Sequence, residues 1–395
     1  MPRNKKSKTN ETKSENKKTR ISIKEKGVKK TSKKKETKKK DSKKVSRKGK
    51  VTKVKTIKKP SHLEFIRYEE NPIIAPKEEN EWEAWQTFNP TAIVLNNQVH
   101  FLYRAVGKDG ISRFGYALSN DGFIIDERLP YPVYEHKIPR PVFNIYSYFS
   151  GGSWGGAEDP RIVRVNNEDT LYMTYTACDN CLGIAITSIK LEDFLNRRWK
   201  WKDPKIISKP GEVHKNWVIF PEKINGKYAI LHSINPNISI AYRDSLEFKE
   251  GEYIESYYKP EFRENCWDNW TRGVGPVPIK TEYGWLIFYH AISANDFGKY
   301  KVGAMLLDLN DPTKILVRSP YPILEPNDIY ENNGCKSGIV YASGAVVKDG
   351  NILIYYGASD SYVCVAYANL EEFLTALIKN QKLKLITQTL KRKIK

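Results

Sequence analysis

Five stretches of this chain repeat one scheme, and this repetition constrains the fold more than any single segment does. The repeats cover residues 89–105, 159–177, 220–233, 275–291 and 343–358, and their starting points lie 55 to 70 residues apart. Each begins at a Pro or Gly step, and an apolar strand, a polar turn and a second strand follow. Five small antiparallel meanders predict an all-β fold, a five-bladed β-propeller. A β-sandwich whose strands resemble one another by chance is the alternative.

The strong positive charge of the chain belongs to its first 60 residues. They contain 27 Lys and Arg against 5 Asp and Glu, which leaves 39 basic and 41 acidic residues for the remainder. We expect a disordered lysine-rich tail over residues 1–60, because it has too few apolar residues to offset its ordering entropy. The tail either solubilises the protein or serves as an arm for nucleic acid, an anionic membrane surface or a nuclear import receptor. The near-neutral remainder, residues 61–395, is expected to be the propeller domain, and its charge disfavours nucleic-acid binding there.

Targeting and cysteine patterns favour a cytoplasmic protein, with a nuclear location as the alternative because of the basic tail. No apolar segment follows the first basic residues as in a signal peptide, and the longest apolar stretch is too short to form a transmembrane segment. The five cysteines are scattered, and the pair in CDNC (178–181) lacks a second Cys or His pair beside it. The sequence therefore predicts neither a disulfide framework nor a metal site.

Two positions recur in every repeat and predict a functional site. In a propeller, equivalent ends of the innermost strands surround the axis, so these positions converge. The first is occupied by Asn89, Asp159, Phe220, Gly275 and Ser343, and the second by Arg104, Thr176, His232, His290 and Gly357. Hydrophobic packing would not select a ring containing Asn, Asp, Arg and two His. We therefore expect a polar funnel with perturbed pKa values.

The segment GGSWGGAEDPR (151–161) places acids directly behind glycines. Pro160 fixes the backbone beside Asp159, and the glycines predict a flexible loop that leaves the carboxylate open to a ligand. Arg161 is expected to pair with Glu158 or with substrate. Trp154 is placed either to stack on a sugar or to anchor the loop. No helix follows, so this is not a phosphate-binding glycine loop.

The chain has no nucleophile elbow, zinc-protease, dinucleotide-binding or EF-hand motif. Carboxylates, cations and histidines in an aromatic-rich funnel suit glycosyl transfer, which needs a general acid for the leaving oxygen and a nucleophile on the opposite face. If that nucleophile is phosphate, cationic side chains take the place of a second carboxylate.

A set of longer motifs spans residues 68 to 375. They are FNPTAIVL, FLYRAVG, SRFGYALSNDG, GGAEDPRI, FPEKINGKYAILH, GPVPIKTEYGWLIFYHA, LEP and SGAVVKDGNILIYYGASD. Together they resemble glycoside hydrolase family 130, which comprises mannoside phosphorylases and some β-1,2-mannosidases built as five-bladed propellers. The resemblance implies an inverting glycoside phosphorylase that cleaves β-mannoside oligosaccharides with inorganic phosphate to give α-mannose 1-phosphate. Phosphate would be a co-substrate, and no cofactor is expected.

The resemblance also implies roles for individual residues. Asp159 in the EDPR motif would be the general acid, with its proton passing through a sugar hydroxyl in the family's phosphorylases. The residues implied at the phosphate and the adjoining subsite are Arg104, Lys215, Asn216, Lys280 and His290. Those implied at mannose are Asn89, Arg113 and Asp360, and Trp154, Arg161 and His232 complete the substrate-binding prediction.

One departure from the family keeps hydrolysis open as an alternative. Ser233 follows the LH of the third repeat, where the family's phosphorylases often carry an arginine. An inverting hydrolase would need a second carboxylate as base, for which Glu222, Glu325 and Asp360 are the candidates. A non-catalytic carbohydrate-binding propeller is the third reading. The linkage, the acceptor sugar and the presence of a homo-oligomer stay open.

Overall fold

The computed structural model describes residues 65–137, 155–179, 182–256 and 261–380. The chain divides into two units, Met1–Lys58 and Lys59–Lys395, and all described residues belong to the second. The predicted tail and Trp154 therefore lie outside the described residues.

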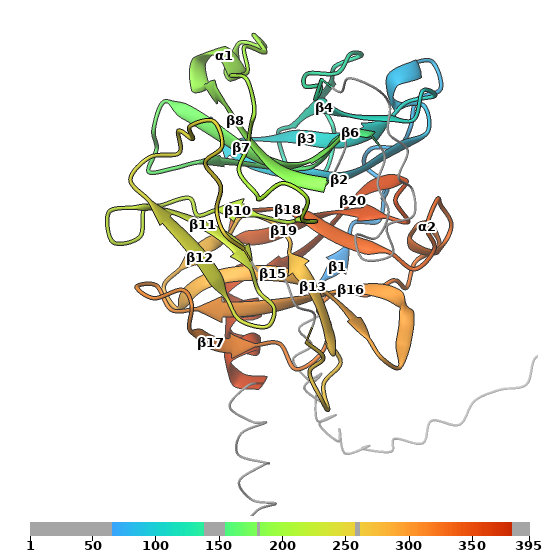
Figure 1. The fold of residues 1–395 in the computed structure, drawn as a ribbon. Helices are drawn as coiled ribbons and strands as arrows, with labels where there is room; N and C mark the ends of the chain where they lie inside the picture. Colours follow the sequence, from blue (N-terminus) through green and yellow to red (C-terminus); the bar gives the residue numbers. More distant parts are fainter. Residues whose placement is uncertain (1–64, 138–154, 180–181, 257–260, 381–395) are drawn as a thin grey trace, which may run out of the picture. The chain divides into compact units, whose positions relative to one another are not determined.

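The described residues form a five-bladed β-propeller, as the sequence predicts (Figure 1). Blade 1 contains β2 (Gln86–Leu95), β3 (Gln98–Val106), β4 (Ile111–Ser119) and β5 (Glu127–Arg128). Blade 2 contains β6 (Gly155–Arg164), β7 (Thr170–Cys178), β8 (Leu182–Lys190) and β9 (Lys205–Ile206). Blade 3 contains β10 (Val218–Ile219), β11 (Tyr228–Ser233) and β12 (Ser239–Arg243). Blade 4 contains β13 (Trp270–Val274), β14 (Ile279–Thr281), β15 (Gly284–Ser293), β16 (Asp296–Leu307) and β17 (Ile315–Arg318). Blade 5 contains β18 (Val340–Lys348), β19 (Asn351–Ala358), β20 (Tyr362–Asn369) and β1 (Ile66–Arg67). The short helices are η1 (Glu81–Glu83), α1 (Leu191–Leu195) and α2 (Ile329–Asn332), and a further helix covers residues 370–380.

The core consists of five hydrophobic clusters, one at each interface between neighbouring blades. Successive side chains of a strand point to opposite faces, so one strand serves two interfaces. In β3, Phe101 packs toward blade 5 and Leu102 packs toward blade 2. The cluster that contains Phe101 also contains Leu353 of blade 5. Since it joins blade 5 to blade 1, the ring of blades is closed.

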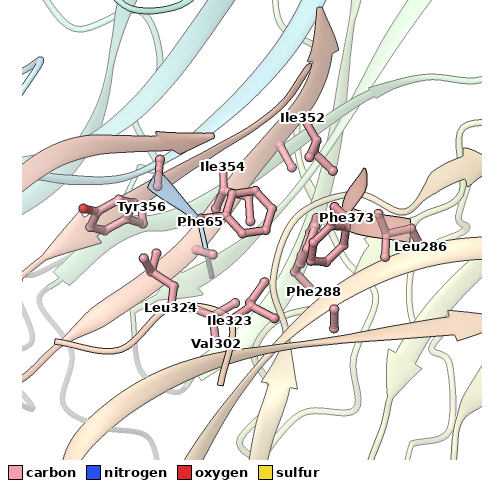
Figure 2. Packing of buried hydrophobic residues seen from close by; sticks show 14 of the residues in the cluster. Phe65, Leu286, Phe288, Val302, Ile323, Leu324, Ile352, Ile354, Tyr356 and Phe373 are labelled. Carbon is pink, nitrogen blue, oxygen red and sulfur yellow. The ribbon is translucent and has the colours of Figure 1, made fainter. Parts of the chain in front are cut away.

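The N-terminal strand closes blade 5, a feature that the repeat pattern did not predict. Strand β1 pairs antiparallel with β20, with Ile66 opposite Tyr367. Directly before β1, the ring of Phe65 lies 5.1 Å from that of Phe373 and 6.0 Å from that of Phe288 (Figure 2). Phe373 belongs to the helix over residues 370–380, so the first and the last described segments both pack into the interface between blades 4 and 5.

Blades 1, 4 and 5 share a buried triad of tyrosine, acid and arginine. The tyrosine lies in the blade's second strand, the acid precedes the blade, and the arginine comes from the outermost strand. The triads are Tyr103–Glu83–Arg128, Tyr289–Asp268–Arg318 and Tyr356–Glu331–Arg67. Each tyrosine directly precedes a predicted ring position, so the triads fix the strands that carry those positions.

The innermost strands of blades 1 and 2 carry β-bulges at their Asn-Pro and Asp-Pro steps. The register shifts between Phe88 and Thr91 in β2 and between Glu158 and Arg161 in β6. Asn89 and Asp159 have φ angles of 45° and 52°, a left-handed conformation that Asn and Asp tolerate better than most residues. Such strain is often stored at functional sites.

The glycines before Asp159 have another role than the sequence predicted. Gly155 and Gly156 belong to β6 and pair in parallel with Ile111 and Ser112 of β4, which joins blades 1 and 2 in one sheet. Gly156 has a φ of 106°, and a Cβ there would lie 2.3 Å from the carbonyl oxygen of Ser112. The predicted flexible loop is therefore wrong for these two residues, and position 156 requires glycine because the two backbones approach closely there.

Candidate active site

The side chains of Asn89 and Asp159 meet between blades 1 and 2. Asn89 donates from Nδ2 to Oδ1 of Asp159 over 2.8 Å, and Arg104 donates from Nη1 to the same oxygen over 3.1 Å. The space for Asn89 is provided by Gly357 of blade 5, where a Cβ would lie 2.0 Å from Oδ1 of Asn89. Three blades thus position one carboxylate.

Arg104 also binds a second buried carboxylate, that of Glu158. Its Nη2 lies 2.7 Å from Oε1 of Glu158, and Nζ of Lys215 lies 3.1 Å from Oε2. The guanidinium packs over the ring of Phe88 at 4.6 Å. The two acids of the EDPR motif therefore share Arg104, and removing either partner would leave a buried charge uncompensated.

The surrounding cations determine the charge of Asp159. Burial would raise the pKa of Asp159, but the positive charges of Arg104, Lys215 and Arg161, together with the hydrogen bond from Asn89, hold it well below its usual range. Asp159 is therefore a carboxylate at neutral pH in this arrangement of charges.

Arg161 binds the backbone of the bulge and does not pair with Glu158 as predicted. Nε donates to the carbonyl oxygen of Gly275 over 2.6 Å, and Nη1 donates to the carbonyl oxygens of Asp159 and Pro160 over 2.9 and 3.1 Å. The side chain is buried and does not line the cavity described below. Arg161 thus ties the backbone at Asp159 to the first residues after β13, which fits a positioning role better than the predicted contact with substrate.

His290 stacks against Tyr341, with ring centroids 4.0 Å apart and an interplanar angle of 14°. Its Nε2 donates to the carbonyl oxygen of Ala342 over 2.7 Å. Burial, with the nearby charge of Arg161, lowers the pKa of His290 to about 3, so the ring is neutral. Tyr341 lines the cavity and donates from its hydroxyl to Oδ1 of Asn216, whereas His290 does not line it. The position of His290 therefore suits support of Tyr341 and not the predicted contact with phosphate.

Asn89, Arg104, Asp159 and Tyr341 line a cavity of about 590 Å³, within the range of about 300–1,000 Å³ typical of small-molecule sites. Seven predicted residues line it: Asn89, Arg104, Asp159, Lys215, Asn216, His232 and Asp360. The structure thus brings together side chains that are up to 271 positions apart, from Asn89 to Asp360.

Besides Arg161 and His290, two more predicted residues do not line the cavity. Lys280 of β14 pairs with Glu222 over 2.5 Å on the surface. In the sheet, Lys280 stands opposite Trp285, near one end of β15, whereas His290 lies near the other end. Arg113 binds Asp109 and Glu135 over 2.6 and 2.8 Å. Neither lines the cavity, so the implied roles of Lys280 at phosphate and Arg113 at mannose are not supported by their positions.

Of the three carboxylates considered as hydrolytic bases, only Asp360 lines the cavity. It pairs with Lys336 over 2.8 Å. Glu222 binds Lys280, as described above, and Glu325 binds Lys301 over 2.9 Å.

Sequence reasoning missed several cavity residues. Arg272 and Lys336 add two cations, and Glu212 adds a carboxylate that contacts His214 over 2.9 Å. Tyr341 stands opposite Gly357, as Phe88 stands opposite Arg104 and Glu158 opposite Thr176. The pairing with the second ring position was thus the available signal for Tyr341. Lys336 and Glu212 lie between the strands, where no repeat marks them.

Among the described residues, no group of three or more His, Cys, Asp or Glu is arranged to hold a metal ion. No helix in this part of the chain is long and apolar enough to span a membrane.

Comparison with known proteins identifies the family. The family model described as β-1,4-mannooligosaccharide phosphorylase, glycoside hydrolase family 130, matches residues 49–379. The chain belongs to this family.

Three relatives illustrate the range of the family. A 1,2-β-oligomannan phosphorylase from Thermoanaerobacter sp. (strain X514) is 37% identical over 329 residues, which is 78% of this chain and 99% of that protein. The solved β-1,2-mannobiose phosphorylase from Listeria innocua, in complex with β-1,2-mannobiose, is 27% identical with a TM-score of 0.61, covering 79% of this chain and 99% of that one. A third structure is described with the words "The GH130 family of mannoside phosphorylases contains glycoside hydrolases that target beta-1,2 mannosidic linkages in Candida mannan". It is 26% identical with a TM-score of 0.62, covering 78% and 94%.

Proposed function

We propose that this protein is an inverting β-mannoside phosphorylase that acts on β-1,2-linked mannooligosaccharides and releases α-mannose 1-phosphate. Membership of a family of mannoside phosphorylases supports the reaction type. The β-1,2 linkage is supported by the oligomannan and mannobiose phosphorylases to which the chain is similar.

The observation that carries the proposal is the meeting of Asp159 with four cations in one cavity. Arg104, Lys215, Arg272 and Lys336 line it together with Asp159. A phosphate nucleophile needs a cationic cradle on the face opposite the general acid. Arg272 and Lys336 provide charge that offsets the missing arginine at Ser233, which also lines the cavity.

The electrostatics of the site give phosphate a second effect. Asp159 must carry a proton to act as general acid, yet Arg104 and Lys215 stabilise its carboxylate form. A phosphate dianion bound to these cations cancels part of their charge, and this raises the pKa of Asp159 in the complex. Phosphate binding thereby favours the protonated acid that the reaction needs.

In the proposed step, a phosphate oxygen forms a bond to the anomeric carbon while the bond from that carbon to the leaving oxygen breaks. The leaving oxygen takes the proton of Asp159, directly or through a sugar hydroxyl. The proton that hydrogen phosphate loses restores Asp159 through solvent, so the cycle is balanced. One displacement inverts β to α.

The test is product analysis by ¹H and ³¹P NMR with β-1,2- and β-1,4-mannobiose, with and without phosphate. We expect α-mannose 1-phosphate from β-1,2-mannobiose and no sugar release without phosphate. Equal release of mannose in both conditions would refute phosphorolysis.

Hydrolysis is the second candidate, because a family structure is described with hydrolases and because Asp360 presents a second carboxylate to the cavity. If mannose is released without phosphate, Asp360→Asn should abolish that release while the fold is retained. Unchanged release in this variant would reject Asp360 as the base.

A further inference from the structure

An aromatic surface extends from the wall of the cavity along blade 4. Arg272 and Tyr300 line the cavity, and Nε of Arg272 donates to the hydroxyl of Tyr300 over 2.7 Å. The guanidinium of Arg272 lies 4.2 Å above the ring of Trp270. Phe297 stacks on Trp270 with centroids 5.3 Å apart and an angle of 26°, and the ring of Phe262 lies 5.9 Å from that of Trp270. We call Phe262, Trp270 and Phe297 the aromatic platform.

The platform is exposed although its side chains are apolar. Phe262 is 64% exposed and Phe297 is 50% exposed, whereas Trp270 beneath them is buried. None of the three belongs to the clusters between the blades. Packing of the propeller therefore does not account for these rings, and exposed aromatic surface beside a cavity is typical of a binding site.

The fold builds the platform by lengthening one hairpin. Strands β15 and β16 have 10 and 12 residues, and the third strands of blades 1, 2 and 5 have 8 or 9. Trp270 pairs with Ile292 near the turn of this hairpin, and Phe297 is the second residue of β16 after the turn. The extension thus continues the cavity wall outward from Tyr300.

The chemistry of the surface matches a sugar ring. A pyranose has an apolar face of C–H groups that packs on an aromatic ring, and its equatorial edge carries hydroxyls that accept from a guanidinium. Arg272 stands between the cavity and the platform and offers donors at the junction. A chain of sugars that leaves the cavity at Tyr300 therefore meets donors first and rings next.

We propose that the aromatic platform is a distal subsite that binds a mannose unit of β-mannosides longer than a disaccharide, so that the enzyme prefers oligosaccharides to mannobiose. This inference rests on the proposed function. The occupant is a continuation of the substrate itself, because the platform is joined to the catalytic cavity through Arg272 and Tyr300.

The test compares kcat/KM for phosphorolysis of β-1,2-mannobiose, mannotriose and mannotetraose. In Phe297→Ala and Phe262→Ala, we expect the ratio of tetraose to biose kcat/KM to fall by a factor of about two to ten, the value of one aromatic contact. Phe297→Trp should restore the ratio, since it keeps a stacking surface. Tyr283 is another exposed aromatic residue, in the turn between β14 and β15 at the other end of the blade, and Tyr283→Ala should leave all three values unchanged.

An unchanged ratio in both alanine variants, with mannobiose still cleaved, would overturn the platform and leave the proposed function standing. A binding measurement tests the platform even if the proposed phosphorolysis is wrong. In the Asp159→Asn background, calorimetry with mannotetraose should show weaker binding after Phe297→Ala, whether or not the wild type uses phosphate. Equal affinity of the two proteins would reject the subsite independently of the reaction.

Discussion

The positioning of Asp159 by Asn89 makes Gly357→Ala a sharp test of the site. Gly357 has no role of its own in catalysis, but its missing side chain provides the space for Asn89. A Cβ at this position would lie 2.0 Å from Oδ1 and 2.9 Å from the backbone nitrogen of Asn89. Because the amide cannot stay at 2.0 Å from a methyl group, the side chain must turn away and lose its 2.8 Å hydrogen bond to Asp159.

The expected loss follows from the value of that bond. A hydrogen bond to a charged group contributes about 1.5–3 kcal/mol, which corresponds to a decrease of about 10- to 150-fold in kcat/KM. Asn89→Ala removes the same bond and should give a loss of the same size. In the Asn89→Ala background, Gly357→Ala should then cost less than it does alone, because the 2.0 Å contact with the amide is gone and only the 2.9 Å contact with the backbone nitrogen of residue 89 is left.

The assay is phosphorolysis of β-1,2-mannobiose, with thermal unfolding of each variant to show that the fold is kept. Gly298→Ala is the matched control, because a Cβ there meets nothing within 4 Å. Full activity of Gly357→Ala, or losses that add in the double variant, would refute the claim that Asn89 positions Asp159 from this side.

Four further predictions test other parts of the account. Asp159→Asn should lower kcat by about 10²- to 10⁴-fold while calorimetry still detects oligosaccharide binding; retained turnover would reject Asp159 as the acid. Arg67→Met leaves the buried carboxylate of Glu331 uncompensated and should cost about 3–5 kcal/mol in urea unfolding. Arg198→Met breaks only surface pairs with Glu192 and Asp193 and should leave the free energy of unfolding nearly unchanged; equal effects of the two substitutions would refute the closure role of β1. Burial lowers the pKa of His100 to about 4, and an unfolded histidine titrates near about 6.5. The unfolded chain therefore binds the proton first, and stability falls between pH 6.5 and 4 by about 1.4 kcal/mol per pH unit for this group; His100→Gln should reduce that slope, and an identical slope would contradict the assignment. Deletion of residues 1–60 should leave phosphorolysis unchanged, and loss of activity in a folded truncation would contradict the assignment of catalysis to residues 61–395.

Periodicity carried the prediction of the fold because each blade is a local unit. Strand, turn and strand are close in sequence, and five repeats of the unit leave few architectures. The closing strand escaped detection because Ile66 and Arg67 form only two residues of strand. Its partner, β20, lies about 300 residues away, so no local pattern marks the pairing.

The site was predictable where it follows the register and unpredictable where it depends on side-chain direction. The Pro steps after Asn89 and Asp159 mark the bulges that turn both residues toward the cavity. Lys280 of β14 pairs with one end of β15, and His290 lies near the other end of β15. Which end faces the cavity depends on where each hairpin turns. Arg272 was missed because the repeat was aligned from Gly275 onward, although the innermost strand already begins at Trp270.

The most direct test of the account is a crystal structure of the Asp159→Asn variant with phosphate and β-1,2-mannobiose. We predict phosphate oxygens within hydrogen-bond distance of Arg104 and Lys215, with the anomeric carbon of the cleavable mannose between the anion and residue 159. A sugar bound there with the anion elsewhere, and a water held by Asp360 in line with the anomeric carbon, would contradict it.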